Sequence, residues 1–188
     1  MKKYSLLLIV LFCTVILSQS FGQTAKEERK QEKAEKKAVK FTKDSISNQF
    51  YKTLVASQAF VLEANTLYDK SGKSFILNRS TNFVGFEGKN STIQLAFDQL
   101  VGWNGVGGVT LDGTVSTMEV TDNKKGLGFT INVTVMQQVG GVVTMIFRVS
   151  ADGNARVDMS GSFGERITYQ GMIVSLAEST VYKGISRF

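Results

Sequence analysis

Histidine is absent from the 188 residues of the chain, and cysteine occurs once, at Cys13. Without histidine, neither a Ser-His-Asp triad nor a Cys-His pair can form, and the commonest zinc ligand is missing. Because Cys13 lies in an apolar N-terminal run, a chain that loses this run carries no thiol and forms no disulfide. Carboxylates are then the only strong metal ligands, and we expect neither a metal site nor a cofactor.

Residues 1–22 have the features of a signal peptide. Two lysines precede an apolar run at residues 5–17, and small residues follow at Ser20 and Gly22. The run is shorter than the roughly 20 residues that a membrane-crossing helix needs. We expect cleavage before Gln23, export of the remainder, and no membrane span after cleavage. An uncleaved N-terminal anchor is the alternative.

The net charge of +6 is concentrated near the N-terminus. Residues 46–188 hold twelve Lys and Arg against eleven Asp and Glu, so this part of the chain is almost neutral. A domain that grips phosphate backbones gathers basic residues on one face. We therefore expect no nucleic-acid partner.

Residues 23–57 are predicted to form a charged amphipathic helix. Thr24 and Glu27 fit a capping box, and Glu and Lys recur at the three- and four-residue spacings that support a solvated helix. Apolar residues come later and fall on one helical face: Val39, Ile46, Phe50 and Leu54. We expect the first half of the helix to project into solvent or fray, with a specific partner for it as the alternative. We expect the second half to pack on an apolar surface.

From Phe60 onward the hydrophobic period is two, which predicts β-strands. The alternation is clearest in "TIQLAF", "GFTINVTVM" and "VVTMIFRVS", and turn clusters separate such segments at residues 122–126, 139–141 and 151–154. Proline is absent, so glycine, Asn and Asp must form these turns. Residues 58–188 are therefore predicted to form eight or nine strands of a single antiparallel β-barrel or sandwich.

The stretch "VGWNGVGGVTLDG", residues 101–113, is rich in glycine and holds the only tryptophan. A dinucleotide loop would need a third glycine where Thr110 stands, and a helix after it, whereas the following residues alternate like a strand. The glycines instead favour a bend or bulge at the entry of a strand. Trp103 and Asn104 are the candidate ligand-binding residues, with a tryptophan that plugs the core as the alternative.

The acidic residues of the β region mostly stand alone in the sequence, and no calcium-loop spacing is present. A glycoside hydrolase needs two carboxylates roughly 5 to 10 Å apart, and Asp98 with Asp112 is the pair we considered. We expect no catalytic residues and treat a two-carboxylate hydrolase as a minor alternative.

The charged helix and five further segments together carry a family resemblance: "NFVGFEG", "IQLAF", "GWNGVGGVT", "GFTINVTV" and "VSADGNARVDMSGSFGERITYQGMI". The resemblance is to a bacterial family of exported proteins, domain of unknown function 4251 (DUF4251). It implies a mainly β fold, a barrel of lipocalin-like topology, and a location in the periplasm or cell envelope of a Gram-negative bacterium. It implies no activity, so no residue inherits a role from it.

These observations predict an exported, non-enzymatic binding module that takes a small apolar or carbohydrate ligand in the mouth of the barrel, near Trp103 and Asn104. The alternative is a structural or assembly protein of the cell envelope that meets an envelope protein through its N-terminal helix.

Overall fold

The computed structural model describes residues 2–96, 107–124, 126–138, 141–161 and 166–184, with side chains described from residue 26. It divides into two compact units, Met1–Lys43 and Asp44–Phe188. Helix α1 (Lys2–Ala56) supplies the first unit and enters the second. The second unit holds the strands β1 (Ala59–Tyr68), β2 (Ser74–Ile76), β3 (Phe83–Glu87), β4 (Asn90–Ala96), β5 (Gly108–Asp122), β6 (Phe129–Gln137), β7 (Val142–Val149), β8 (Asn154–Gly161) and β9 (Arg166–Ser175).

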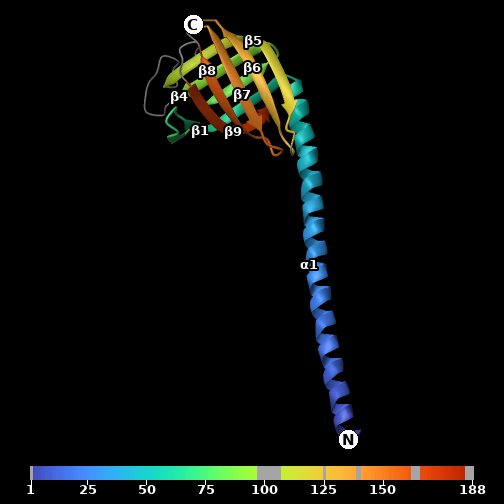
Figure 1. Ribbon diagram of the computed structural model, residues 1–188. Coiled ribbons are helices and arrows are strands. Elements are labelled where there is room, and N and C mark those ends of the chain that lie inside the picture. Colours follow the sequence, from blue (N-terminus) through green and yellow to red (C-terminus); the bar gives the residue numbers. More distant parts are fainter. Residues whose placement is uncertain (1, 97–106, 125, 139–140, 162–165, 185–188) are drawn as a thin grey trace. The chain divides into compact units, whose positions relative to one another are not determined.

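The strands form one antiparallel sheet that closes on itself, as Figure 1 shows. Along the sheet each strand from β3 to β9 pairs with the next, and β1 pairs with both β3 and β9. Eight strands thus make a closed barrel, while β2 only extends one end of β1. The mainly β prediction is confirmed, and the barrel replaces the sandwich as its form.

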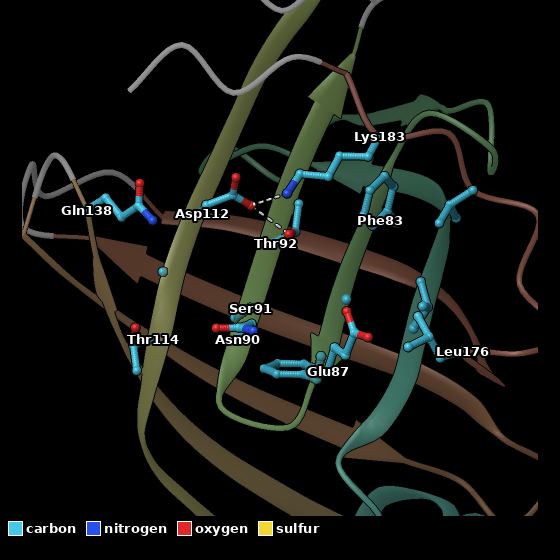
Figure 2. Close-up of a pocket in the computed structure, with 15 residues that line it drawn as sticks. Phe83, Glu87, Asn90, Ser91, Thr92, Asp112, Thr114, Gln138, Leu176 and Lys183 are labelled. Atoms are coloured by element: carbon cyan, nitrogen blue, oxygen red, sulfur yellow. Dashed lines mark hydrogen bonds and ion pairs between the residues drawn. The ribbon is translucent and has the colours of Figure 1, made fainter.

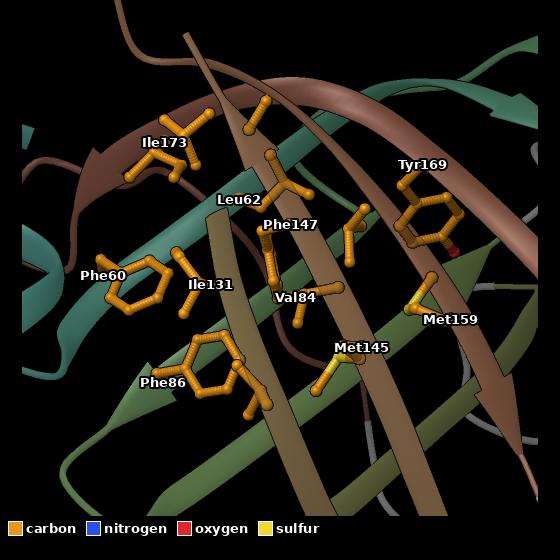
Figure 3. Packing of buried hydrophobic residues seen from close by; sticks show 14 of the residues in the cluster. Phe60, Leu62, Val84, Phe86, Ile131, Met145, Phe147, Met159, Tyr169 and Ile173 are labelled. Carbon is orange, nitrogen blue, oxygen red and sulfur yellow. The ribbon is translucent and has the colours of Figure 1, made fainter. Parts of the chain in front are cut away.

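Apolar side chains fill the barrel interior in the two-residue alternation that the sequence predicts. Phe60, Leu62 and Ala64 on β1 are completely buried. Figure 3 shows rings from three strands meeting, with centroids 4.8 Å apart for Phe60 and Phe86 and 5.9 Å apart for Phe86 and Phe147. An eight-stranded barrel is just wide enough for its side chains to fill it or for one small ligand. Here large side chains occupy the interior.

Helix α1 begins at Lys2, so the predicted capping box at Thr24 lies inside it and not at its start. The apolar leader consists largely of residues that a helix accommodates, and the helix therefore continues through it. Within the first unit, Glu32 and Lys36 form an ion pair at the i,i+4 spacing that supports a solvated helix. Cleavage before Gln23 stays a prediction.

The last turns of α1 pack on the hairpins at one end of the barrel. Val55 is fully buried in the core cluster, and Tyr51 packs against that cluster. The Asn48 side-chain oxygen accepts a 2.9 Å hydrogen bond from the Gly128 amide, and Lys52 forms an ion pair with Asp122. These contacts fix which face of the helix is buried.

The predicted apolar face of the helix is wrong in part. Ile46 is 68% exposed and Phe50 56% exposed, whereas Leu54 is partly buried. The buried face is centred about half a turn away, because polar contacts of Asn48 and Lys52 help to hold the helix on the barrel. Hydrophobic spacing alone therefore did not identify the packed side.

The predicted Asp152-Gly153 turn joins β7 and β8. Gly153 has a φ of +84°, which glycine tolerates better than other residues. A Cβ at this position would also lie 2.1 Å from Cζ of Tyr51, so the turn sits directly against the helix. A second tight turn, between Glu87 and Asn90, joins β3 and β4.

Candidate functional site

The outer surface of the barrel carries a concave pocket over β3, β4 and β5, which Figure 2 shows and which we call the β3–β5 pocket. Its volume is about 390 Å³. Thr92 and Asp112 face it because they alternate along β4 and β5 with Ile93 and Leu111, which pack against the core. The pocket therefore lies on the side of the sheet opposite the packed interior.

The Asp112 side chain contacts two neighbouring side chains in the pocket. Thr92 lies directly opposite on the neighbouring strand and donates a 2.6 Å hydrogen bond to the Asp112 carboxylate. Lys183 Nζ lies 2.8 Å from the same carboxylate oxygen. Both contacts are drawn in Figure 2. A carboxylate held by a hydroxyl and an ammonium is fixed in orientation.

Lys183 reaches the pocket because the chain after β9 crosses the outside of the sheet, and we call residues 176–184 the C-terminal strap. The Tyr182 amide donates to the Ser80 carbonyl over 2.7 Å. Ser179 and Thr180 both donate to the Glu63 carboxylate, over 2.9 and 3.3 Å. The strap is therefore attached to the barrel at several points before it presents Lys183.

Gln94 on β4 anchors the strap from beneath. Its amide nitrogen donates to the carbonyls of Thr81 and Tyr182, each over 2.9 Å. Its amide oxygen accepts from the Thr110 hydroxyl at 2.9 Å and from the Gly184 amide at 2.7 Å. Gln94 is completely buried, and the hydrogen bonds of its side chain satisfy both ends of the amide.

Apolar groups and one glycine form the floor of the pocket. Val61, Gly85 and Thr92 lie side by side on three neighbouring strands, and Phe83 lies two residues from Gly85 on β3. A Cβ at Gly85 would meet Val61 and Phe83 at 3.7 to 3.8 Å, so the absence of a side chain leaves this part of the floor open. Among the described residues, the buried Ser91 hydroxyl beside the pocket has no hydrogen-bond partner.

The remaining polar groups lie at the rim. Glu87, Asn90 and Gln138 line the pocket together with Leu176 and Val181 of the strap. Figure 2 shows Glu87 and Asn90 at the end of the β3–β4 hairpin, away from the Asp112 cluster. The pocket thus offers hydrogen-bond donors and acceptors around an apolar patch.

Most of the candidate site residues from the sequence lie outside the part of the chain that the structure describes. Trp103, Asn104 and Asp98 fall outside the described residues, in the connection between β4 and β5, whereas Asp112 lies in the pocket. Thr92 and Lys183 were missed. The alternation of "TIQLAF" places Thr92 on the outer face, but no sequence signal shows that the strap brings Lys183 to it.

The described part of the chain lacks two features, a cluster of metal ligands and a helix suited to cross a membrane. No group of three or more acidic, Cys or His residues within it is close enough together to hold a metal ion. Among these residues, no helix combines the length and apolar character that a bilayer crossing requires.

Comparisons with known proteins agree with the architecture. A family described as a domain of unknown function, DUF4251, matches residues 42–173, so the match begins within α1 and ends in β9. The crystal structure of a DUF4251 family protein from Bacteroides eggerthii DSM 20697 is 31% identical to this chain, with a TM-score of 0.56. The similarity covers 71% of this chain and 91% of that one. No curated protein matches the chain. The chain therefore belongs to the DUF4251 family of β-barrel domains with no assigned function.

Proposed function

We propose that the barrel is a non-enzymatic binding module that takes a small carbohydrate in the β3–β5 pocket. The observation that carries the proposal is the Asp112 carboxylate, fixed by Thr92 and Lys183 at the edge of an apolar floor that Gly85 leaves open. Ligand pockets combine a few oriented polar groups with apolar walls, and a volume of about 390 Å³ suits a small ligand.

The pocket favours a carbohydrate over a purely apolar ligand. Asp112, Glu87 and Asn90 supply acceptors, and the amide of Asn90 and the ammonium of Lys183 supply donors. A sugar offers hydroxyl groups to such a rim and its C–H face to the floor. An apolar ligand would take water away from the exposed rim groups Glu87 and Asn90 and offer them no hydrogen bonds in exchange, which costs free energy. The packed barrel interior also leaves the outer surface as the better place for a ligand.

Trp103 and Asn104 are included in the proposed binding site because of their position in the sequence. They lie in the connection between β4 and β5, the strands that supply Thr92 and Asp112. An aromatic ring is a suitable platform for the apolar face of a sugar. Because Trp103 is the only tryptophan, its fluorescence reports on this connection alone.

A fluorescence titration tests the proposal. We expect a carbohydrate fraction of a cell-envelope extract to quench Trp103, and Asp112→Asn to weaken the effect about tenfold, the usual consequence of losing one charged hydrogen bond. Glu119→Gln is the matched control, because Glu119 is an exposed acid farther along the same strand. Equal titration curves for Asp112→Asn and the unaltered protein would overturn the assignment of the pocket.

We also propose that the module is exported and acts in the periplasm or cell envelope. The support is the N-terminal sequence, in which a basic start, an apolar run and small residues precede Gln23. Mass spectrometry of the protein from its native envelope tests this. A mature N-terminus at Gln23 is expected, and an intact Met1 on the envelope protein would contradict cleavage.

A structural or assembly role for the N-terminal helix is the second candidate. It is favoured by the exposed apolar side chains Ile46 and Phe50, which the barrel does not cover. Deleting residues 24–43 together with Ile46→Ser and Phe50→Ser would then remove an envelope partner from a pull-down while the ligand signal persists. A partner that remains bound to this variant would contradict the role.

A further inference from the structure

A second pocket of about 410 Å³ lies on the outer face of β7, β8 and β9, beside the end of β1. Arg148, Arg156 and Arg166 line it, together with Tyr68, Asp158 and Thr168, and we call it the arginine pocket. Arg148 and Arg156 face outward because they alternate with the buried Phe147 and Val157. The arginine pocket and the β3–β5 pocket share no lining residue.

The strand register places two of these arginines directly opposite each other. Arg148 on β7 pairs with Arg156 on β8. Like charges at facing positions of an antiparallel pair destabilise the sheet. The arrangement costs least when negative charge lies beside the two guanidinium groups, and Asp158 supplies such charge to Arg148.

Asp158 orients two of the three arginines. Its side chain is only 10% exposed, and one carboxylate oxygen pairs with Arg148 and lies 3.4 Å from Arg166. The other oxygen accepts a 2.6 Å hydrogen bond from Thr168, its cross-strand neighbour. Burial raises the pKa of Asp158, but the Thr168 hydroxyl and the two guanidinium groups outweigh burial and hold the pKa below its ordinary value. Asp158 is therefore a fixed anion that positions Arg148 and Arg166.

Arg156 is held by a different contact. Its guanidinium lies 4.6 Å from the centre of the Tyr68 ring, and the Tyr68 hydroxyl donates to the Gln170 side chain over 3.1 Å. Stacking on an aromatic face fixes the plane of a guanidinium while its N–H groups point outward along that plane. Arg156 is thus oriented before any ligand arrives.

The charges of the pocket do not balance. Its lining includes Lys70 and three arginines against two acids, Asp69 and Asp158. Asp69 is committed to its own turn, because its carboxylate accepts from the amides of Ser71 and Lys73 over 2.8 and 2.9 Å and from the Ser71 hydroxyl over 2.6 Å. Asp158 alone cannot neutralise the three arginines, so the described lining of the pocket keeps a positive surplus.

We propose that the arginine pocket binds an oxyanion, namely a carboxylate, sulfate or phosphate group of a small ligand. The planar, rigid fork of a guanidinium matches two oxygens of such a group and forms charge-assisted hydrogen bonds with them. Arg148 and Arg166 are 56% and 65% exposed, so these bonds form at a partly solvated site and weaken with salt. This inference does not depend on the carbohydrate proposal.

Isothermal titration of the purified protein at low ionic strength tests the inference, with inorganic phosphate, sulfate and galacturonate as separate probes. We expect at least one probe to bind, and the ranking of the three assigns the oxyanion class. Arg156→Gln and Arg166→Gln should each weaken that binding about tenfold, in keeping with the loss of one charge-assisted contact. The affinity of Arg156→Lys should lie between those of Arg156→Gln and the unaltered protein, because lysine keeps the charge and lacks the planar guanidinium.

Arg79→Gln is the matched control, since Arg79 is an exposed arginine on the connection between β2 and β3. It should leave the affinity within about twofold, as expected for an exposed charge that does not line the pocket and that salt screens. Failure of all three probes to bind the unaltered protein would overturn the inference. Equal weakening by Arg79→Gln and Arg156→Gln would also overturn it, because the binding would then follow net charge and not this pocket.

Discussion

Replacing Gln94 by methionine should detach the C-terminal strap without opening a large cavity. Methionine has a similar length and volume, so the main loss is the set of four hydrogen bonds to Thr81, Tyr182, Thr110 and Gly184. The two strap contacts matter most, because the Tyr182 carbonyl and the Gly184 amide lose the partner that Gln94 supplied.

The expected magnitude follows from these bonds. A hydrogen bond contributes a net free energy of about 1 kcal/mol, so Gln94→Met should lower the free energy of unfolding by about 3 to 4 kcal/mol. For a domain of this size, each kcal/mol lowers Tm by roughly 3 °C, so Tm should fall by about 10 °C. Urea unfolding followed by circular dichroism measures the free energy, and calorimetry measures Tm.

A local readout separates loss of the strap from general weakening. Trypsin cuts after lysine, and Lys183 lies on the strap close to Asp112. Under native conditions, Gln94→Met should speed cleavage after Lys183 far more than cleavage within the strands. Gln138→Ala is the control, because Gln138 has the same side chain in an exposed position. A loss of unfolding free energy below about 1 kcal/mol in Gln94→Met, the size of a single hydrogen bond, would refute the conclusion that Gln94 anchors the strap.

Further substitutions test the packing and the charges. Gly171→Ala should lower the free energy of unfolding by about 2 kcal/mol through overpacking, because the added Cβ would lie 2.0 Å from the Glu63 carbonyl oxygen. Gly161→Ala is the control, because a Cβ there would meet only a side chain, at 3.8 Å. Equal unfolding midpoints for the two variants would contradict the clash. Val55→Ala should cost about 2 kcal/mol at its fully buried site, whereas Ile46→Ala should stay within about 0.5 kcal/mol, and chemical denaturation decides between them. The lowered pKa of Asp158 means that its charged form stabilises the fold above the ordinary Asp pKa of about 3.9 and that this contribution disappears as pH falls through the folded value. The stability difference between the unaltered protein and Asp158→Asn should therefore shrink below about pH 4, and a difference independent of pH would show that the carboxylate charge is not involved.

The strands of the barrel were predictable from the sequence because the patterns that specify them lie within short segments. Inward and outward residues alternate in segments such as "GFTINVTVM", where Phe129, Ile131, Val133 and Val135 are all buried. Glycine with Asp or Asn marks the hairpins, and the absence of proline leaves few other residues to form turns. Closure into a barrel in place of a sandwich depends on the pairing of β1 with β9, which no local pattern specifies.

The β3–β5 pocket was much less predictable. Gln94 occupies an outward position of its strand, where a polar residue indicates exposure, yet the strap covers it completely. Lys183 lies outside any periodic segment, so its meeting with Asp112 depends on the path of the strap. The buried face of α1 was mispredicted for a related reason: Asn48 satisfies the Gly128 amide of a hairpin far away in the sequence.

Saturation-transfer NMR on the purified protein tests most directly whether the ligand is a sugar in the outer pocket. The probes are neutral oligosaccharides such as maltotriose and cellobiose, with lauric acid as the apolar comparison. The account predicts transfer to a sugar in the unaltered protein, loss of that transfer in Asp112→Asn, and its retention in Glu119→Gln. Transfer to lauric acid with none to any sugar, unchanged by Asp112→Asn, would contradict it.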